Sequence, residues 1–240
     1  MGYDIKPRFN HESLADFENE YLEIINSVKN YTLTSPERMA ALINSIQYIV
    51  KNQISGNIVE CGVWRGGSMM LVAKVLLAMK KTEYDLYLFD TFEGTTKPSK
   101  HDLDYLGNSM LDVWNKEFEG KKILPDSSDF VPLEEVKKNL FSTGYPKEKI
   151  HFIQGNVEDT IPKNAPEKIS LLRLDTDWYK STKHELNNLF ARLTPGGILI
   201  IDDYGHFQGS KKAVDEYFDE NKIPSFLFRI DYTGRLCVKS

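Results

Sequence analysis

Short apolar runs recur through the middle of the chain, and segments with the apolar spacing of helices lie between them. The runs are NIVEC (57–61), LYLFD (86–90), IHFIQG (150–155), SLLRLD (170–175) and GILIIDD (197–203). Helical spacing covers residues 68–80, 133–143, 180–193 and 210–221. Alternation of strands with helices predicts a mostly parallel sheet that helices cover on both faces.

Both ends of the chain add elements to this pattern. Residues 12–29 and 36–51 have helical spacing, with Ser35 placed to cap the second helix and Pro36 at its first position. Near the end, SFLFRI (225–230) and RLCVKS (235–240) flank a Tyr-Thr-Gly turn and predict a closing antiparallel hairpin. The sequence therefore predicts an N-terminal helical cap segment over 1–52 and one α/β domain with a seven-stranded sheet over 53–240.

Residues 91–131 interrupt this order because about forty residues show no strong period. Connections of that length are uncommon in compact domains and often serve as lids or binding loops. Its apolar residues include Tyr105 and Trp114, so we interpret it as a lid-like insertion. The alternative is a surface insertion without order.

Composition argues against several classes of protein. The net charge of −5 over 240 residues argues against a general nucleic-acid binder. No apolar run reaches the length of a membrane span, and the polar, acidic N-terminus lacks a signal-peptide core. Cys61 and Cys237 lie in apolar runs, and we interpret them as reduced core residues of a cytoplasmic protein.

Acidic residues end four of the apolar runs: Glu60, Asp90, Asp175 and Asp202. In open α/β sheets, ligands bind outside the carboxyl ends of the strands. We therefore expect these acids to line one rim of the sheet. Charges at the ends of buried strands cost free energy unless something compensates them, so a ligand or cation is expected there.

A glycine-rich turn follows the first of these runs. Gly62, Gly66 and Gly67 lie between a strand and a helix, where backbone N–H groups can approach a ligand and the helix N-terminus favours a negative group. The spacing is not that of the dinucleotide fingerprint. Asp90 could accept hydrogen bonds from ribose hydroxyls, and an adenine could lie beside residues 155–157, so the three strand ends predict a nucleoside-type ligand.

Four motifs, in this order, resemble the macrocin O-methyltransferase (TylF-type) family: VECGVWRGGS (59–68), FDTFEG (89–94), LRLDTDWYKST (172–182) and GGILIIDDYG (196–205). The stretch YTLTSPERMAAL (31–42) resembles the family's N-terminal segment that closes over the cofactor. The family consists of sugar O-methyltransferases that use S-adenosylmethionine and Mg²⁺. The resemblance implies a Rossmann-like class I methyltransferase fold, and a homodimer formed through the N-terminal helices.

The resemblance also implies roles for individual residues. Those that would bind S-adenosylmethionine are Thr32, Glu60, Gly62, Trp64, Ser68, Asp90, Thr91, Asn156, Val157 and Asp175. Those that would hold Mg²⁺ are Asp175, Asp202 and Asp203. Asp177 would act as the general base. Apart from the resemblance, His206 is a candidate to orient the acceptor or act as a second base, and the alternative is an exposed loop histidine.

The chemistry of methyl transfer explains this choice of residues. A sugar hydroxyl is hardly ionised at neutral pH, so a divalent cation is needed to lower its pKa and a base to take its proton. If the two strands are neighbours, Asp175, Asp202 and Asp203 converge on one cation. Asp177 lies on the same side as Asp175 if the chain stays extended, and Arg173, which alternates with leucines, suits an ion pair with a buried acid.

The predicted activity is methylation of a sugar-like vicinal diol on a glycan or glycosylated small molecule. A catechol-type acceptor is the alternative, since it presents the same pair of oxygens. The D-x-D pattern of Asp175 and Asp177 also occurs in metal-dependent glycosyltransferases and in phosphatases with an aspartyl nucleophile. The phosphatase pattern normally follows the first strand of its domain, whereas here the fourth carries it.

Overall fold

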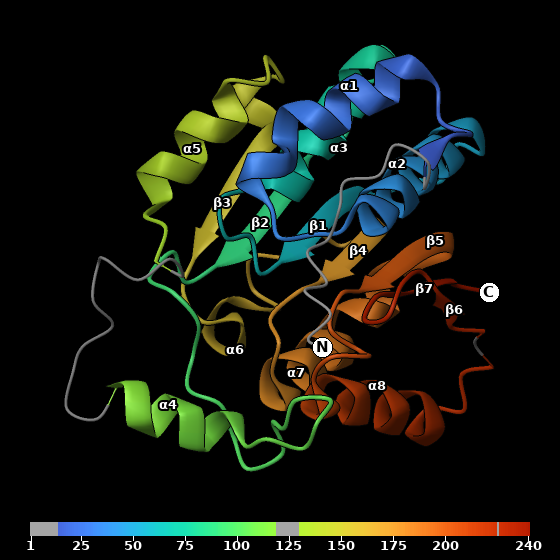
Figure 1. The fold of residues 1–240 in the computed structure, drawn as a ribbon. Coiled ribbons are helices and arrows are strands. Elements are labelled where there is room, and N and C mark those ends of the chain that lie inside the picture. The colour runs from blue at the N-terminus through green and yellow to red at the C-terminus, as the bar shows by residue number, and fades with distance from the viewer. Residues whose placement is uncertain (1–13, 119–129, 225) are drawn as a thin grey trace.

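A seven-stranded sheet with the strand order β3-β2-β1-β4-β5-β7-β6 forms the centre of the computed structural model, which describes residues 14–118, 130–224 and 226–240 (Figure 1). Its parallel strands are β1 (Asn57–Cys61), β2 (Leu86–Asp90), β3 (Ile150–Gln154), β4 (Ile169–Leu174) and β5 (Leu193–Ile201). β7 (Arg235–Val238) pairs antiparallel with β5 and with β6 (Phe228–Arg229). The predicted fold class is confirmed.

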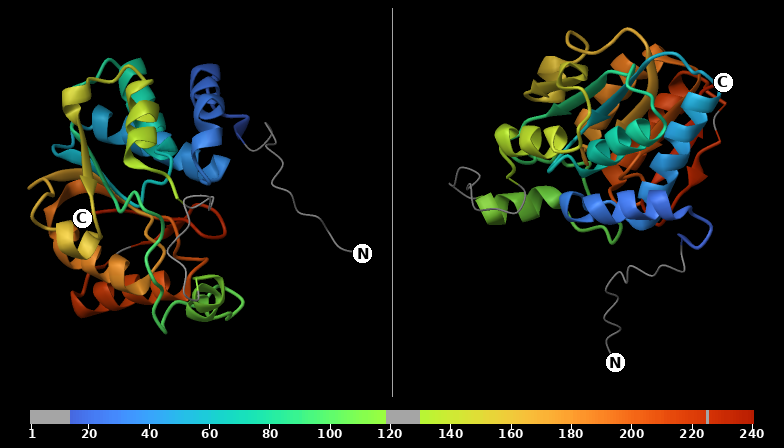
Figure 2. Two further views of the ribbon diagram at one scale, coloured as in Figure 1. Left: turned by 90° about the vertical axis from the view of Figure 1, so that its left-hand side faces the viewer. Right: turned by 90° about the horizontal axis from the view of Figure 1, so that it is seen from above.

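Helices cover both faces of this sheet. The helices of one face are α1 (Asn19–Val28), α2 (Pro36–Lys51), α3 (Gly67–Ala78) and α5 (Leu133–Phe141) (Figure 2). Those of the other are α6 (Val157–Thr160), α7 (Tyr179–Leu189) and α8 (Gln208–Glu220). Short 3₁₀ turns are η2 (Lys29–Tyr31), η3 (Lys147–Lys149) and η4 (Phe190–Arg192). Each face has its own apolar core, so the sheet is buried on both sides.

The N-terminal helices share the core of the domain. Ser35 caps α2 as predicted, because its Oγ accepts a hydrogen bond from the Arg38 N–H at 3.1 Å. Ile25 of α1 and Met39 of α2 are buried in the same cluster as the apolar residues of α3. α1 begins at Asn19, later than predicted, and residues 12 and 13 of the predicted helix lie outside the described residues.

The predicted insertion contains one helix, α4 (Met110–Phe118), that the pattern did not predict. Before it, the carboxylate of fully buried Asp102 accepts hydrogen bonds from Ser99 N–H at 2.6 Å and from Tyr179 N–H, in the first turn of α7, at 2.7 Å. Gly209 in α8 leaves room for this carboxylate, since a Cβ there would overlap Asp102 Oδ1. The insertion is therefore anchored at the starts of α7 and α8; its residues 119–129 lie outside the described part.

Other details bear on the sequence predictions. Cys61 and Cys237 are buried and form no disulfide, as expected. The closing hairpin is confirmed, although its first strand is only Phe228–Arg229. Over the described residues, no helix has the length and apolar character needed to span a membrane.

Candidate active site

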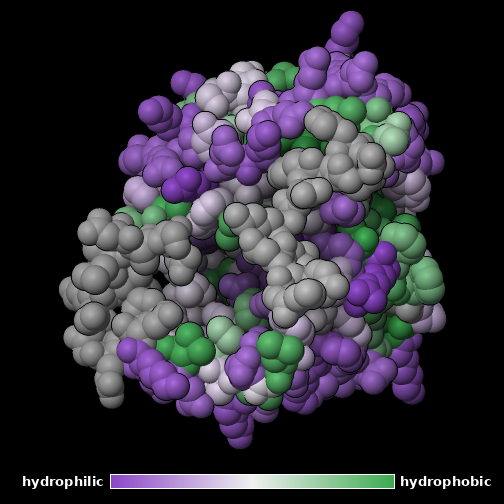
Figure 3. Space-filling model, viewed as in Figure 1, coloured by the Kyte–Doolittle hydropathy of each residue, from purple (hydrophilic) through white to green (hydrophobic). Residues whose placement is uncertain are grey.

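A cavity of about 550 Å³ opens at the carboxyl ends of the central parallel strands, on the face where Figure 3 shows a hollow between groups of hydrophilic and hydrophobic residues. Every residue predicted for the site lines this cavity except Glu60. Glu60 is 1% exposed and makes its contacts behind the lining. The structure therefore brings the predicted residues together around one cavity, and it adds the internal arrangement of their acids.

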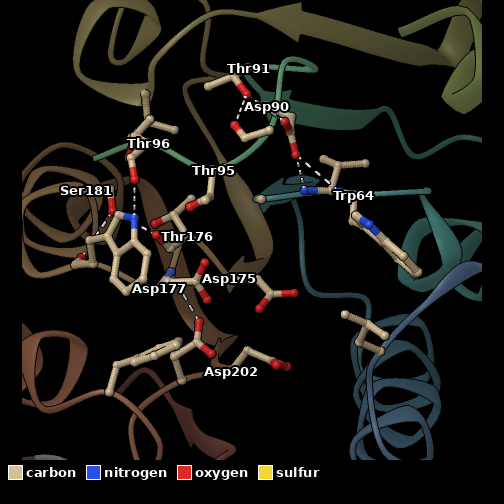
Figure 4. A pocket seen from close by; sticks show the side chains of 18 of the residues that line it. Trp64, Asp90, Thr91, Thr95, Thr96, Asp175, Thr176, Asp177, Ser181 and Asp202 are labelled. Atoms are coloured by element: carbon tan, nitrogen blue, oxygen red, sulfur yellow. Dashed lines mark hydrogen bonds between the residues drawn. The ribbon is translucent and has the colours of Figure 1, made fainter. Parts of the chain in front are cut away.

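The glycine-rich turn forms one wall of the cavity. Gly62 has φ +82°, and a Cβ there would overlap the carbonyl oxygen of Asp175, so only glycine allows β1 to end so close to β4. Asp90 Oδ2 accepts hydrogen bonds from the N–H groups of Val63 at 2.6 Å and Trp64 at 3.2 Å (Figure 4). Asp90 therefore fixes the shape of the turn as well as facing the cavity.

Arg173 is the centre of a buried ion network behind the aspartates. Its guanidinium, in a side chain only 3% exposed, donates to Glu60 at 2.6 Å, to Asp175 at 2.7 Å and to Asp202. A fourth hydrogen bond, of 3.0 Å, reaches Thr34 Oγ1. Burial alone would lower the pKa of Arg173, but the three carboxylates raise it well above its ordinary value. The predicted pairing of Arg173 with a buried acid is confirmed.

Asp202 occupies a different position from the one predicted. Its Oδ1 accepts from Arg173, and its Oδ2 from Arg38 in α2, which also contacts Asp231 at 3.0 Å. Both carboxylate oxygens of Asp202 thus receive an arginine, and Asp202 is not among the three aspartates whose ligand oxygens converge. The physical reason is electrostatic, because two arginines in reach of a carboxylate that is 3% exposed compensate its charge without a cation.

Three other aspartates come together at the ends of β4 and β5. Ligand oxygens of Asp175, Asp177 and Asp203 lie within 4.8 Å of one another. Burial raises the pKa of Asp203 well above its ordinary value, and Asp177 and Asp175 raise it further. Burial also raises the pKa of Asp175, to about 6, against the effect of Arg173. The group, called here the aspartate cluster, has the donor atoms and the excess negative charge that a divalent cation would relieve.

A left-handed turn brings Asp177 into this cluster. Asp177 has φ +64°, so the chain beyond Asp175 is not extended as the sequence argument assumed. The Asp177 N–H donates to Asp203 Oδ2 at 3.3 Å, and the hydroxyl of Thr176 donates to Glu185 at 2.9 Å. Glu185 is fully buried, and burial raises its pKa to about 8. Two strand ends and one buried carboxyl group of α7 thus hold the turn.

The N-terminal segment closes the cavity from the side of α2. Thr32, Leu33 and Thr34 line the cavity together with Ser68 of α3, and the hydroxyls of Thr34 and Ser68 lie 3.5 Å apart. Leu33 is 79% exposed although it contributes to the lining. That residues 31–42 close over the cofactor stays a prediction.

His206 and the hairpin turn form the outer end of the cavity. The hydroxyl of Tyr232 and His206 Nδ1 lie 3.2 Å apart, and both residues line the cavity. Burial lowers the pKa of His206. Trp114, from the insertion, lines the cavity as well. The lid role of the insertion stays a prediction.

Arg38 and Tyr232 are two of the lining residues that the sequence reasoning missed. Arg38 lies within the quoted stretch 31–42, one turn after its cap Ser35, but helical spacing alone cannot show that it reaches the end of β5. Tyr232 belongs to the Tyr-Thr-Gly turn that predicted the hairpin. Its position next to His206 could not be inferred without the strand order.

Comparison with known proteins gives a family match over most of the chain. The model of the macrocin O-methyltransferase (TylF) family matches residues 25–238. An O-methyltransferase from Streptomyces olivaceus, named 8-demethyl-8-(2,3-dimethoxy-α-L-rhamnosyl)-tetracenomycin-C 4'-O-methyltransferase, is 31% identical over 204 residues, which are 85% of this chain and 74% of that protein. Demethyldecarbamoylnovobiocin O-methyltransferase from Streptomyces niveus is 29% identical over 204 residues, which are 85% of this chain and 74% of that protein.

Solved structures agree with this match. The structure of the O-methyltransferase NovP superposes with a TM-score of 0.77 at 27% identity, over 88% of this chain and 82% of NovP. The calicheamicin methyltransferase CalS11 superposes with a TM-score of 0.63 at 17% identity, over 99% of this chain and 97% of CalS11. At 17% identity, the similarity to CalS11 concerns the fold alone.

Proposed function

Because the chain belongs to the macrocin O-methyltransferase (TylF) family and is therefore an S-adenosylmethionine-dependent O-methyltransferase, we propose that it methylates one hydroxyl of a sugar-like vicinal diol with the help of Mg²⁺. The observation that carries this proposal is the aspartate cluster at the cavity, where Asp175, Asp177 and Asp203 converge. The names of the relatives support a sugar as the acceptor, since one includes a rhamnosyl group. A catechol-type acceptor remains the alternative, and catechol itself serves as the test compound for it.

The residues predicted to bind the cofactor suit it, because all of them except Glu60 line the cavity. A volume of about 550 Å³ lies within the usual range of small-molecule sites. Glu60 would act on the cofactor only through Arg173, with which it forms an ion pair behind the lining. Asp90 would accept hydrogen bonds from the ribose, and Asn156 and Val157 would flank the adenine. S-adenosylmethionine, when bound, supplies a methyl group on a positively charged sulfur.

The aspartate cluster fits a divalent cation because it concentrates carboxylate oxygens at a buried position. Asp175 and Asp203 are the two ligands on which the sequence prediction and the observed cluster agree. Mg²⁺, when bound, would lower the pKa of a neighbouring acceptor hydroxyl. Asp202 would contribute through Arg173, whose guanidinium it shares with Asp175.

Proton removal is the step that this chain's own residues perform. Asp177 lies in the cluster and lines the cavity, so we assign it as the base that takes the hydroxyl proton. As the proton passes to Asp177, the acceptor oxygen forms a bond to the methyl carbon. In the same displacement the carbon–sulfur bond of the donor would break, and sulfur would keep the electron pair. The fixed turn at Asp177 holds the base in place during the transfer.

Titration calorimetry tests this proposal. S-adenosylhomocysteine is titrated into the wild type with and without Mg²⁺, and into Asp90→Ala. We expect binding to the wild type and its loss in Asp90→Ala. Asp85→Ala is the matched control, because Asp85 lies just before the opposite end of β2 and pairs with Lys149 and His151.

The acceptor class is tested by methyl transfer. Methyl glycosides with vicinal hydroxyls are compared with catechol, in the presence of S-adenosylmethionine and Mg²⁺ or of a chelator. Transfer to a glycoside that depends on Mg²⁺ supports the proposal. Transfer to catechol alone, or transfer unaffected by chelation, would overturn the acceptor class or the metal requirement respectively.

A further inference from the structure

A buried carboxyl group of α7 lies behind the turn that carries Asp177. Glu185 is fully buried, and its Oε1 accepts a hydrogen bond of 2.9 Å from the hydroxyl of Thr176. Its Oε2 is buried too and has no hydrogen-bond partner among the residues that the structure describes. Burying such a group costs free energy that an apolar side chain would not cost. Proteins accept costs of this kind mainly at functional sites, so we expect Glu185 to serve the cavity rather than the core.

Asp177 needs support from its surroundings to keep its conformation. Its φ of +64° lies in the left-handed region, which is unfavourable for most residues with a Cβ and is kept only where neighbouring contacts hold it. In the peptide unit just before it, the carbonyl of Thr176 accepts from the Trp178 N–H at 2.7 Å and from Ser181 Oγ at 3.2 Å. The N–H of the same peptide unit donates to Asp203 Oδ2 at 3.3 Å. These contacts therefore bear on the direction in which the Asp177 side chain leaves the turn.

The hydrogen bond from Thr176 to Glu185 differs from the contact with Asp203 in one respect. Asp203 belongs to the aspartate cluster, so a cation bound there would share its carboxylate with the turn. Glu185 reaches the turn from α7 and is not among the described residues that line the cavity. It can therefore hold Thr176 in the same place whether or not the cluster is occupied.

The position of the base decides how fast it can act. A general base works only within hydrogen-bond reach of the proton that it takes, and a displacement of about 1 Å can lower a rate about 10²-fold. Ligand oxygens of Asp175, Asp177 and Asp203 lie within 4.8 Å of one another at the edge of the cavity (Figure 4). If Asp177 left the left-handed region, its carboxylate would move relative to the other two.

We propose that Glu185 is a positioning residue for methyl transfer, which holds the left-handed turn at Asp177, and with it the base, through the hydroxyl of Thr176. This inference rests on the proposed function, because it takes Asp177 as the base. Glu185 itself touches neither the acceptor nor the cofactor in this arrangement. Loss of its contact therefore acts on kcat and leaves cofactor binding unchanged.

Four variants test the hydrogen bond itself. Thr176→Val and Glu185→Leu remove it with side chains of similar size, whereas Thr176→Ser keeps the donor and Glu185→Gln keeps an acceptor oxygen. We measure kcat and KM with S-adenosylmethionine, Mg²⁺ and methyl α-L-rhamnoside. Thr176→Val and Glu185→Leu should lower kcat about 10–10²-fold and leave KM for S-adenosylmethionine unchanged. Thr176→Ser and Glu185→Gln should keep most of the wild-type kcat.

Thermal stability separates positioning from a packing role. Glu185→Leu replaces a buried carboxyl group by an apolar side chain, so it should melt no lower than the wild type although its kcat is reduced. Ser170→Ala is the matched control, because Ser170 is a fully buried hydroxyl at the far end of β4 that donates to the carbonyl of Gly56 at 3.1 Å. It should lower Tm and leave kcat unchanged.

Crystal structures of the wild type and of Thr176→Val give a readout that needs no turnover. We expect Asp177 to lose its positive φ in Thr176→Val and its carboxylate to leave the aspartate cluster. An unchanged Asp177 in that structure would overturn the inference, and so would an equal loss of kcat in Thr176→Ser and Thr176→Val. Failure of the proposed function is separate, since it appears as an absence of methyl transfer by the wild type to every glycoside, whereas the two structures still show whether the contact positions Asp177.

Discussion

Replacing Arg173 by methionine should destabilise the protein strongly, because it removes the cation at the centre of the buried network. Arg173 is 3% exposed and donates to Glu60, Asp175 and Asp202. Removal of one partner from a buried ion pair costs about 3–5 kcal/mol, since the remaining charge is uncompensated. For a chain of this size about 1 kcal/mol changes Tm by about 2–4 °C, so Arg173→Met should lower Tm by about 6–20 °C.

The pH dependence of this loss distinguishes the electrostatic explanation from a packing defect. Without Arg173, burial holds the pKa values of the remaining carboxyl groups above those of the unfolded chain. Groups of this kind favour folding at low pH and lose that contribution as pH rises. The difference in Tm between wild type and Arg173→Met should therefore be smaller at pH 5.5 than at pH 8.

Differential scanning calorimetry at the two pH values measures both effects. Lys137→Met is the control, because it removes an exposed helical ion pair with Glu134, of 2.7 Å, and should not change Tm measurably. A decrease of less than about 3 °C in Arg173→Met would refute the reasoning, since it would mean that the carboxylates do not need this cation. So would a loss of equal size at pH 5.5 and pH 8.

Three other changes test separate parts of the structure. Asp177→Asn should lower kcat about 10²–10⁴-fold and leave calorimetric Mg²⁺ affinity unchanged; lost Mg²⁺ binding would instead make Asp177 a ligand. Burial raises the pKa of Glu185 from 4.5 to about 8, so wild-type stability should decrease as pH rises through that interval, and Glu185→Gln should reduce the decrease in urea denaturation. An unchanged slope would contradict this assignment. Asp102→Ala should lower the free energy of unfolding by about 2–3 kcal/mol in the same urea assay, because it leaves buried donors unpaired. It should also speed proteolysis within the insertion. Cleavage at the wild-type rate would show that Asp102 does not anchor the insertion.

The strand ends could be predicted because apolar runs, helices and terminal acids alternate regularly along the chain. The span of β1, 57–61, and that of β2, 86–90, agree with the predicted runs. β5 begins earlier than predicted, at Leu193, because Pro195 and two glycines interrupt the apolar pattern while Leu193 still pairs with Ile169. α4 was missed because it spans only nine residues, too short a stretch for its five apolar positions to establish a helical period on their own.

Within the site, the sequence identified the acids but could not assign their partners. Spacing placed Asp202 and Asp203 next to Asp175, yet it could not show that Arg38, on a distant helix, would bind Asp202. Alternation along β4 correctly predicted that Arg173 faces buried acids. The position of Asp177 depends on a left-handed residue, which no periodic pattern reveals.

The close approach of Gly62 to the carbonyl of Asp175 has a consequence for enzyme engineering. Because β1 and β4 touch there through their backbones, the offset between the glycine-rich turn and the aspartate cluster is a fixed dimension of the scaffold. Substitutions at that junction cannot tune the offset without breaking the contact. A designer who wants a new product from this scaffold should keep the junction intact and randomise the side chains of Tyr105 and Tyr232, which are exposed at the rim.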